Sequence, residues 1–244
     1  MKKFIFVILL MTFFATSTYV QAEANKSPQP YLFKAGDLDI FIPAPSDKFV
    51  EVGYANKGFL WEIVRSKNLS NGLFVLKTDF SDVMDGLSNL DIEYSTLSKY
   101  ARIQIQEDIV KLDNVAFKAI VDKAKAEVGD SFATNRVEPE KMLIKRVKAL
   151  DLKSSNLQTR TSLGRLFSKP DAYGYGVLIK VKPGNDPSHT KSEPSYIVAG
   201  FTMIHVNEKL ISTYLYAKYE GKDTLKWLQK TTEDWSDAIL KANK

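Results

Sequence analysis

The chain contains two histidines, His189 and His205, and no cysteine. The absence of cysteine excludes disulfides, thiol nucleophiles, iron–sulfur clusters and cysteine-ligated zinc. A site with two histidine ligands would have to join His189 and His205, which no helical spacing relates. His205 ends a run in which alternate residues are apolar. We interpret it as a strand-end histidine with satisfied hydrogen bonds; a catalytic or metal-binding role is the alternative.

Three aspartates recur at every third position, Asp79, Asp82 and Asp85, and Gly86 follows them. Calcium-binding loops carry acids at alternate positions and close with a glutamate, and both features are missing. We interpret the pattern as a strand end that leads into a helical turn, because acidic side chains are favoured at a helix N-terminus. Because the chain has no cysteine and only two scattered histidines, we expect no tight structural zinc, and we assign no metal ligand.

Signatures of common reactions are missing from the sequence. It contains no G-x-S-x-G elbow, no phosphate-binding loop and no dinucleotide fingerprint. The glycines in the run Tyr173-Gly174-Tyr175-Gly176 fall inside a predicted strand, where they allow a bulge or the close approach of another group. We assign no catalytic residue and no cofactor, and a non-enzymatic role is favoured.

Aromatic side chains gather towards the C-terminus, between residues 214 and 235. Such a group can line a ligand groove. Aromatic residues at this density more often fill the core between a sheet and a helix. Our candidate ligand or partner surface consists of Tyr214, Tyr216, Trp227 and His205.

The last helix is predicted over residues 224–242, with Asp223 as its N-cap. Leu228, Trp235 and Ile239 follow one another at spacings of seven and four, so they share one stripe of this helix. We expect the stripe to dock on the sheet and to bury Trp235 deeply. Trp227 lies one position off the stripe and should be partly exposed.

The N-terminus has the layout of a secretory signal peptide. Lys2 and Lys3 precede an apolar run over residues 4–15, and the small-x-small sequence Val20-Gln21-Ala22 follows. The run is shorter than the ~20 residues that a spanning helix needs. We assign residues 1–22 to the signal peptide, with cleavage after Ala24 as the alternative, and expect the mature chain in the periplasm or outside the cell.

Removal of this peptide lowers the formal net charge from +5 to +3, because Lys2 and Lys3 leave and no acidic residue leaves with them. The remaining charge is weak support for a nucleic-acid partner, and we expect none. No second apolar run of spanning length follows, so we expect the mature chain not to cross a membrane.

Residues 23–36 are read as a polar leader and residues 37–244 as a single α+β domain, because no low-complexity linker divides them. The predicted fold is a mostly antiparallel sheet with helices packed on it and a closing C-terminal helix. Helices are expected from Asp113 or Asn114 to about residue 128, ended by Gly129, and over residues 139–150 and 224–242. Strands are expected over residues 37–42, 49–54, 59–65, 73–80, 100–107, 173–181, 196–205 and 210–219.

Two turns are predicted from short motifs, Asn71-Gly72 before Leu73 and Asn207-Glu208 between the last two strands. The strand over residues 210–219 carries bulky side chains on both faces. We therefore expect an inner strand that is covered on both sides.

Two motifs carry a resemblance to a known family. The start, Phe41-Ile42-Pro43-Ala44-Pro45, and the end, Trp235-Ser236-Asp237-Ala238-Ile239-Leu240, resemble those of a family of uncharacterised exported bacterial proteins. The outline is also similar to the PsbP-like fold, with an early hairpin, a central antiparallel sheet and a final helix. The resemblance implies a non-enzymatic accessory or binding subunit and carries over no catalytic motif.

These observations lead to one expected function and two alternatives. We expect an exported, periplasmic, non-enzymatic accessory or binding protein of the bacterial envelope, whose partner is an envelope protein or a wall component. The alternatives are a small-ligand binder that uses the C-terminal aromatic residues, and a hydrolase whose polar groups approach one another only in the fold.

Overall fold

The computed structural model describes residues 29–52, 69–88, 97–106, 111–128, 158–181 and 195–244. The first half of the chain contributes β1 (Tyr31–Ala35), β2 (Leu38–Ile42), β3 (Phe49–Glu51), β4 (Leu69–Leu76), α4 (Phe80–Ser88) and β5 (Lys99–Gln106). The second half contributes α5 (Asn114–Val128), β6 (Gln158–Lys169), β7 (Ala172–Val181), β8 (Ser195–Val206), β9 (Lys209–Lys218) and α7 (Lys222–Ala242).

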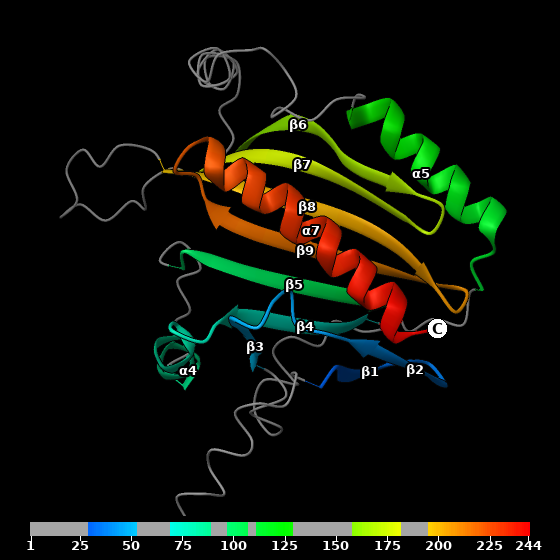
Figure 1. Ribbon diagram of the computed structural model, residues 1–244, viewed down its shortest axis with the longest axis horizontal. Coiled ribbons are helices and arrows are strands. Elements are labelled where there is room, and N and C mark those ends of the chain that lie inside the picture. The colour runs from blue at the N-terminus through cyan, green and yellow to red at the C-terminus, as the bar shows by residue number, and fades with distance from the viewer. Residues whose placement is uncertain (1–28, 53–68, 89–96, 107–110, 129–157, 182–194) are drawn as a thin grey trace, which may run out of the picture.

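Seven strands form one sheet in the order β3-β4-β5-β9-β8-β7-β6. Each neighbouring pair is antiparallel, and β1 and β2 form a separate two-stranded sheet. The helix α7 runs across one face of the large sheet and ends near β1 and β2 (Figure 1). The predicted α+β class, with an antiparallel sheet and a closing C-terminal helix, is confirmed.

Glycines let α7 lie close to the sheet. Gly164, Gly176 and Gly200 are directly opposite one another on β6, β7 and β8, so they form a row without side chains on one face. A Cβ atom added to Gly200 would lie 2.5 Å from the Thr232 hydroxyl of α7 and 3.4 Å from a methyl carbon of Leu228. A larger residue at position 200 would therefore push the helix away.

The predicted apolar stripe of α7 is buried, as expected. Leu228, Trp235 and Ile239 are each at most 1% exposed, whereas Trp227 is half-buried. The Trp235 ring meets the Phe74 ring edge to face at a centroid distance of 5.6 Å.

The far end of α7 also holds the β1–β2 hairpin. The Trp235 Nε1 donates a hydrogen bond of 2.8 Å to the carbonyl oxygen of Pro43. The Asn243 side chain accepts from the Phe41 N–H at 2.8 Å and donates to the Phe41 carbonyl at 2.7 Å. One amide side chain thus satisfies both backbone groups that a neighbouring strand would otherwise pair.

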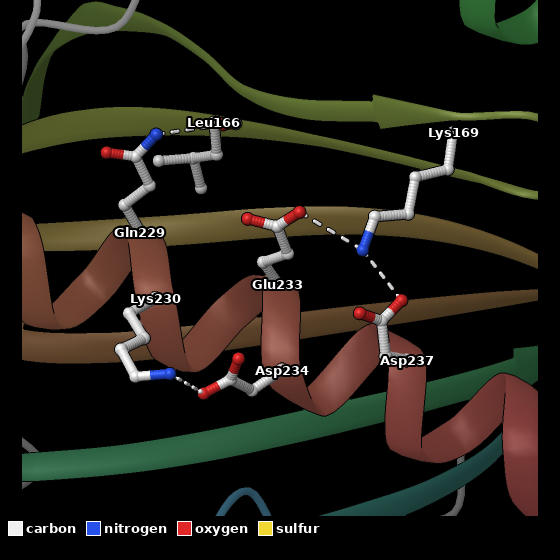
Figure 2. Close-up of polar contacts among 7 residues, drawn as sticks. All are labelled: Leu166, Lys169, Gln229, Lys230, Glu233, Asp234 and Asp237. Atoms are coloured by element: carbon white, nitrogen blue, oxygen red, sulfur yellow. Dashed lines mark hydrogen bonds and ion pairs between the residues drawn. The ribbon is translucent and has the colours of Figure 1, made fainter.

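Ion pairs join α7 to the end of β6 (Figure 2). The Lys169 ammonium lies 3.1 Å from a Glu233 carboxylate oxygen and 2.6 Å from an Asp237 oxygen. Gln229 donates a further hydrogen bond of 3.1 Å to the carbonyl oxygen of Leu166. On the outer side of the helix, Lys230 pairs with Asp234 at 2.8 Å.

The opposite face of the sheet is covered near its ends by the two shorter helices. Phe117 and Val121 of α5 pack against Tyr173. Val83 of α4 packs against Leu73 and Val75 at the other end. The helix α5 begins at Asn114, as predicted, whereas α4 begins at Phe80, which the predicted strand over residues 73–80 had included. Asp113 caps α5 by accepting a hydrogen bond of 2.7 Å from the Ala116 N–H. The helical turn predicted for Asp79, Asp82 and Asp85 is α4, whose first turn contains Asp82.

The Asn207-Glu208 hairpin is confirmed, with positive φ angles of 49° and 60° at the two turn residues. Two positive φ angles define a type I′ turn, whose twist matches that of the flanking strands. The prediction of a turn at Asn71-Gly72 is wrong, because both residues lie inside β4. A Cβ at Gly72 would lie 2.7 Å from the Phe33 ring, so this glycine makes room for β1.

Two further expectations differ from the structure, and one strand was not expected at all. The strand β1 lies within residues 23–36, because its apolar Phe33 and Ala35 are buried, so that range is not leader throughout. The long strand β6 was not predicted. The N-cap of α7 is Gly221 rather than Asp223, and Asp223 lies in the first turn, paired with Lys226 at 3.1 Å.

Several predicted features lie outside the described residues: the signal peptide over residues 1–22, the strand over residues 59–65, the stop at Gly129 and the helix over residues 139–150. In the described part of the chain, none of the helices has the length and apolar character needed to cross a membrane.

Candidate functional site

The central strand β9 has two different faces. Alternate residues from Lys209 to Ala217 are buried, and those between them are partly exposed. The buried set includes Leu215, which lies opposite Gly200 in the row beneath α7. The prediction that this strand is covered on both sides is therefore wrong. Tyr214 and Tyr216 belong to the partly exposed set, so they do not fill the core between sheet and helix.

Five aromatic side chains meet on this second face of the sheet. They come from four adjacent strands, β5, β9, β8 and β7, and all are partly exposed. We call this group the aromatic face, and it consists of Tyr100, Tyr175, Phe201, Tyr214 and Tyr216.

The rings of the aromatic face pack on one another. Tyr175 stacks on Phe201 at 5.3 Å with an interplanar angle of 12°, and Tyr100 stacks on Tyr216 at 4.5 Å and 13°. Phe201 joins the two pairs through edge contacts with Tyr214 at 5.2 Å and Tyr216 at 6.4 Å. Stacked rings cover one another's faces, so they present edges and hydroxyl groups to an approaching molecule.

Cationic side chains lie at both ends of the central row of this face. Tyr214, Phe201 and Tyr175 are directly opposite one another on β9, β8 and β7. The register places Arg102 of β5 opposite Tyr214 and Arg165 of β6 opposite Tyr175. The row therefore reads arginine, three aromatic residues, arginine.

Acidic residues are missing from this part of the sheet. Among the described residues of β4 to β9 that point to this face by register, none is aspartate or glutamate. Arg102 is partly buried and makes no ion pair with any residue in the described ranges. The Tyr214 hydroxyl donates to the Gln104 Oε1 at 2.8 Å, which fixes the ring in place.

The four residues proposed from the sequence separate in the structure. Tyr214 and Tyr216 lie in the aromatic face. His205 lies at the end of the same sheet face, with its Nε2 2.6 Å from the Leu112 carbonyl oxygen and its ring stacked on Phe117 at 5.2 Å. These contacts fit a satisfied strand-end histidine. Trp227 lies on α7, across the sheet, beneath the Lys99 ammonium at 4.4 Å.

Sequence reasoning missed Tyr100, Tyr175 and Phe201 as members of this face. Local patterns do put aromatic residues on one side of a strand, both in β5, where side chains alternate between the two faces, and in the run Tyr173-Gly174-Tyr175-Gly176 of β7. The strand order that brings these strands together cannot be read from such local patterns.

Among the described residues, displaced pKa values are found at Lys111, Lys169 and Lys230, which all form ion pairs. Burial alone would lower the pKa of Lys169, but the hydrogen bonds that its ammonium donates to Asp237 and Glu233 outweigh burial and raise the pKa. A hydrogen bond and the charge of Glu208 raise the pKa of Lys111, and Asp234 does the same for Lys230. A lysine that acts as a base or nucleophile needs a lowered pKa, so these lysines are not arranged for catalysis.

Metal-ligating side chains are scattered in the described part of the chain, which holds no group of three or more His, Cys, Asp or Glu side chains placed to bind an ion.

Comparison with known proteins gives no family. No protein-family model and no curated protein sequence matches the chain. Among solved structures, it is similar to the Ran-binding protein Mog1p of Saccharomyces cerevisiae, at 7% identity over 87% of this chain and 90% of that chain, with a TM-score of 0.30. A point mutant of protein Mog1 gives 7% identity, 87% and 93% coverage and a TM-score of 0.29. Likenesses at this level carry no argument about function.

Proposed function

We propose that this chain is an exported, non-enzymatic accessory or binding protein of the bacterial envelope, and that the aromatic face is its binding surface. The proposal for export rests on the N-terminal sequence, with its two lysines, short apolar run and small-x-small site.

The observation that carries the binding role is the cluster of partly exposed rings that forms the aromatic face at the centre of the sheet. Its four strands are each hydrogen-bonded to a neighbour on both sides. Tyrosine side chains lose little conformational entropy when they bind, and tyrosine and arginine are both enriched among the residues that dominate binding energy. A hydrolase would need converging polar groups with shifted pKa values, and in the described part of the chain the displaced pKa values belong to lysines in ion pairs.

The first experiment tests export. The full chain is expressed in a bacterium without an N-terminal tag, and cell fractions are examined by N-terminal sequencing. We expect protein in the periplasm or medium that begins at Glu23, or at Asn25 for the alternative cleavage site. A chain that stays in the cytosol and still carries residues 4–15 would overturn the export proposal.

The second experiment tests binding. Phe201 is replaced by the photoreactive benzoylphenylalanine, which extends the same ring, and intact cells are irradiated. The matched control carries the label at Lys226, an exposed residue on the outer side of α7. We expect covalent adducts from position 201 and not from position 226. Equal adduct patterns from both positions, or none from either, would contradict a binding role for the aromatic face.

A further inference from the structure

The chemistry of the aromatic face selects a class of partner. The half-buried Arg102 guanidinium has no ion-pair partner among the described residues, and the strand residues around it by register include no described acid. The N–H donors of a planar guanidinium group are placed so that two of them can bind the two oxygens of a carboxylate. The neighbouring rings add to the same preference, because the edge of an aromatic ring is positive.

A second cation lies at the border of this face. The Lys125 ammonium of α5 is 5.9 Å from the centre of the Tyr173 ring, which in turn lies 6.3 Å from the Tyr175 ring. Lys125 is also 3.5 Å from Asp122, a carboxylate of the same helix. That pair is exposed and weak, so Lys125 can turn towards a stronger anion.

The ring geometry argues against a stacking platform. Surfaces that bind single-stranded nucleic acid leave ring faces open for the bases. Here Tyr175 and Phe201 stack on each other, as do Tyr100 and Tyr216. Edges, hydroxyl groups and guanidinium donors fit a protein surface that supplies many acceptors. Tyrosine, phenylalanine and arginine are among the residues that are enriched at the centres of protein interfaces.

From these contacts we infer that the aromatic face binds an acidic segment of a partner protein, with Arg102 paired to one of its aspartate or glutamate side chains. This inference rests on the proposed binding role. It adds the chemical class of the partner and the residue that recognises it.

The test uses the purified full chain with benzoylphenylalanine at position 201 and a detergent-solubilised envelope fraction. After irradiation, mass spectrometry identifies the cross-linked peptide of the partner. The parent chain is compared with Arg102→Glu, Arg102→Lys and the matched control Lys226→Glu, which makes the same charge change on the other side of the molecule. Denaturation midpoints of all variants are measured to show that they are folded.

We expect cross-linked peptides of negative net charge. Arg102→Glu should lower the adduct yield about tenfold, because it places like charges together. Arg102→Lys should keep part of the yield, and Lys226→Glu should leave it unchanged. Salt at about 1 M, where the Debye length is about 3 Å, should reduce the yield of the parent chain.

The outcomes separate the two proposals. A parent chain without adducts would overturn the binding role itself and this inference with it. Adducts that withstand Arg102→Glu, or that map to basic or neutral peptides, to a second copy of this chain, to a glycan or to nucleic acid, would overturn the acidic partner and leave the binding role standing.

Discussion

Trp235 carries two different contacts on one side chain: its ring packs on Phe74, and its N–H donates to the Pro43 carbonyl oxygen. The ring is 1% exposed, so truncation leaves a cavity between helix and sheet. We expect Trp235→Ala to lower the free energy of unfolding by about 3–5 kcal/mol. Urea denaturation measures the change, and Trp227→Ala, at a half-buried position, should cost less. An unchanged midpoint for Trp235→Ala would contradict the core role.

Gly174 is constrained by one neighbour. An added Cβ would lie 2.4, 2.8 and 2.9 Å from three carbons of the Phe167 ring, which is itself buried. We expect Gly174→Ala to destabilise the protein by about 1–3 kcal/mol through overpacking. In a Phe167→Leu background the same change should cost less, because the obstructing ring is gone. Equal costs in both backgrounds would show that the ring is not the cause. Denaturation midpoints of the parent chain, the two single variants and the double variant measure both costs.

At the scale of elements, α7 is held on the sheet by a buried stripe and by the Lys169 ion pairs at its side. The Lys169 side chain is 26% exposed, and its carboxylate partners are 41% and 56% exposed. Ion pairs at this exposure contribute about 0–1 kcal/mol, so most of the docking free energy comes from the apolar stripe.

We expect Lys169→Met to lower the free energy of unfolding by less than about 1 kcal/mol, with a smaller loss at high salt. Its raised pKa sets the pH dependence. The stabilisation that comes from the raised Lys169 pKa is fully present below pH 10.5, the ordinary pKa of lysine. It is lost as the pH rises through the raised pKa. Denaturation at several pH values measures this. Lys230→Met, at a more exposed pair, is the control and should leave the midpoint nearly unchanged. If Lys169→Met still lowers the free energy of unfolding at pH values above the raised pKa, the side chain stabilises the protein through packing rather than through its charge.

At the scale of the whole molecule, the C-terminus closes on the N-terminal hairpin. Asn243 follows the last turn of α7, and its side chain binds both backbone groups of Phe41, 202 positions earlier in the sequence. The hairpin is therefore held to the rest of the protein by the final helix as well as by its own packing on the sheet.

We expect Asn243→Ala to increase the hydrogen-exchange rate of the Phe41 amide by about tenfold, the equivalent of one hydrogen bond of about 1.4 kcal/mol. The amide of Ile211, in the middle of the large sheet, is the control and should keep its protection. Exchange followed by NMR gives both rates. Unchanged protection at Phe41 would mean that the side-chain contact does not stabilise the hairpin.

Local signals in the sequence determined much of the fold. The spacing of Leu228, Trp235 and Ile239 gave the buried stripe of α7, and Asp113 gave the start of α5, because periodicity and capping depend on nearby residues alone. The same kind of signal failed at Asn71-Gly72. There the glycine serves a neighbour distant in sequence, Phe33, rather than a turn.

Tertiary structure alone decided which face of the sheet α7 covers and therefore what Tyr214 and Tyr216 do. Their alternation with Ile211, Thr213 and Leu215 is the same whichever face is buried. The row of glycines on β6, β7 and β8 gives the helix room on one face only, and these glycines come into line through strand register. Close packing on that face leaves the tyrosines, Phe201 and Arg102 together on the other, where they form the proposed binding surface.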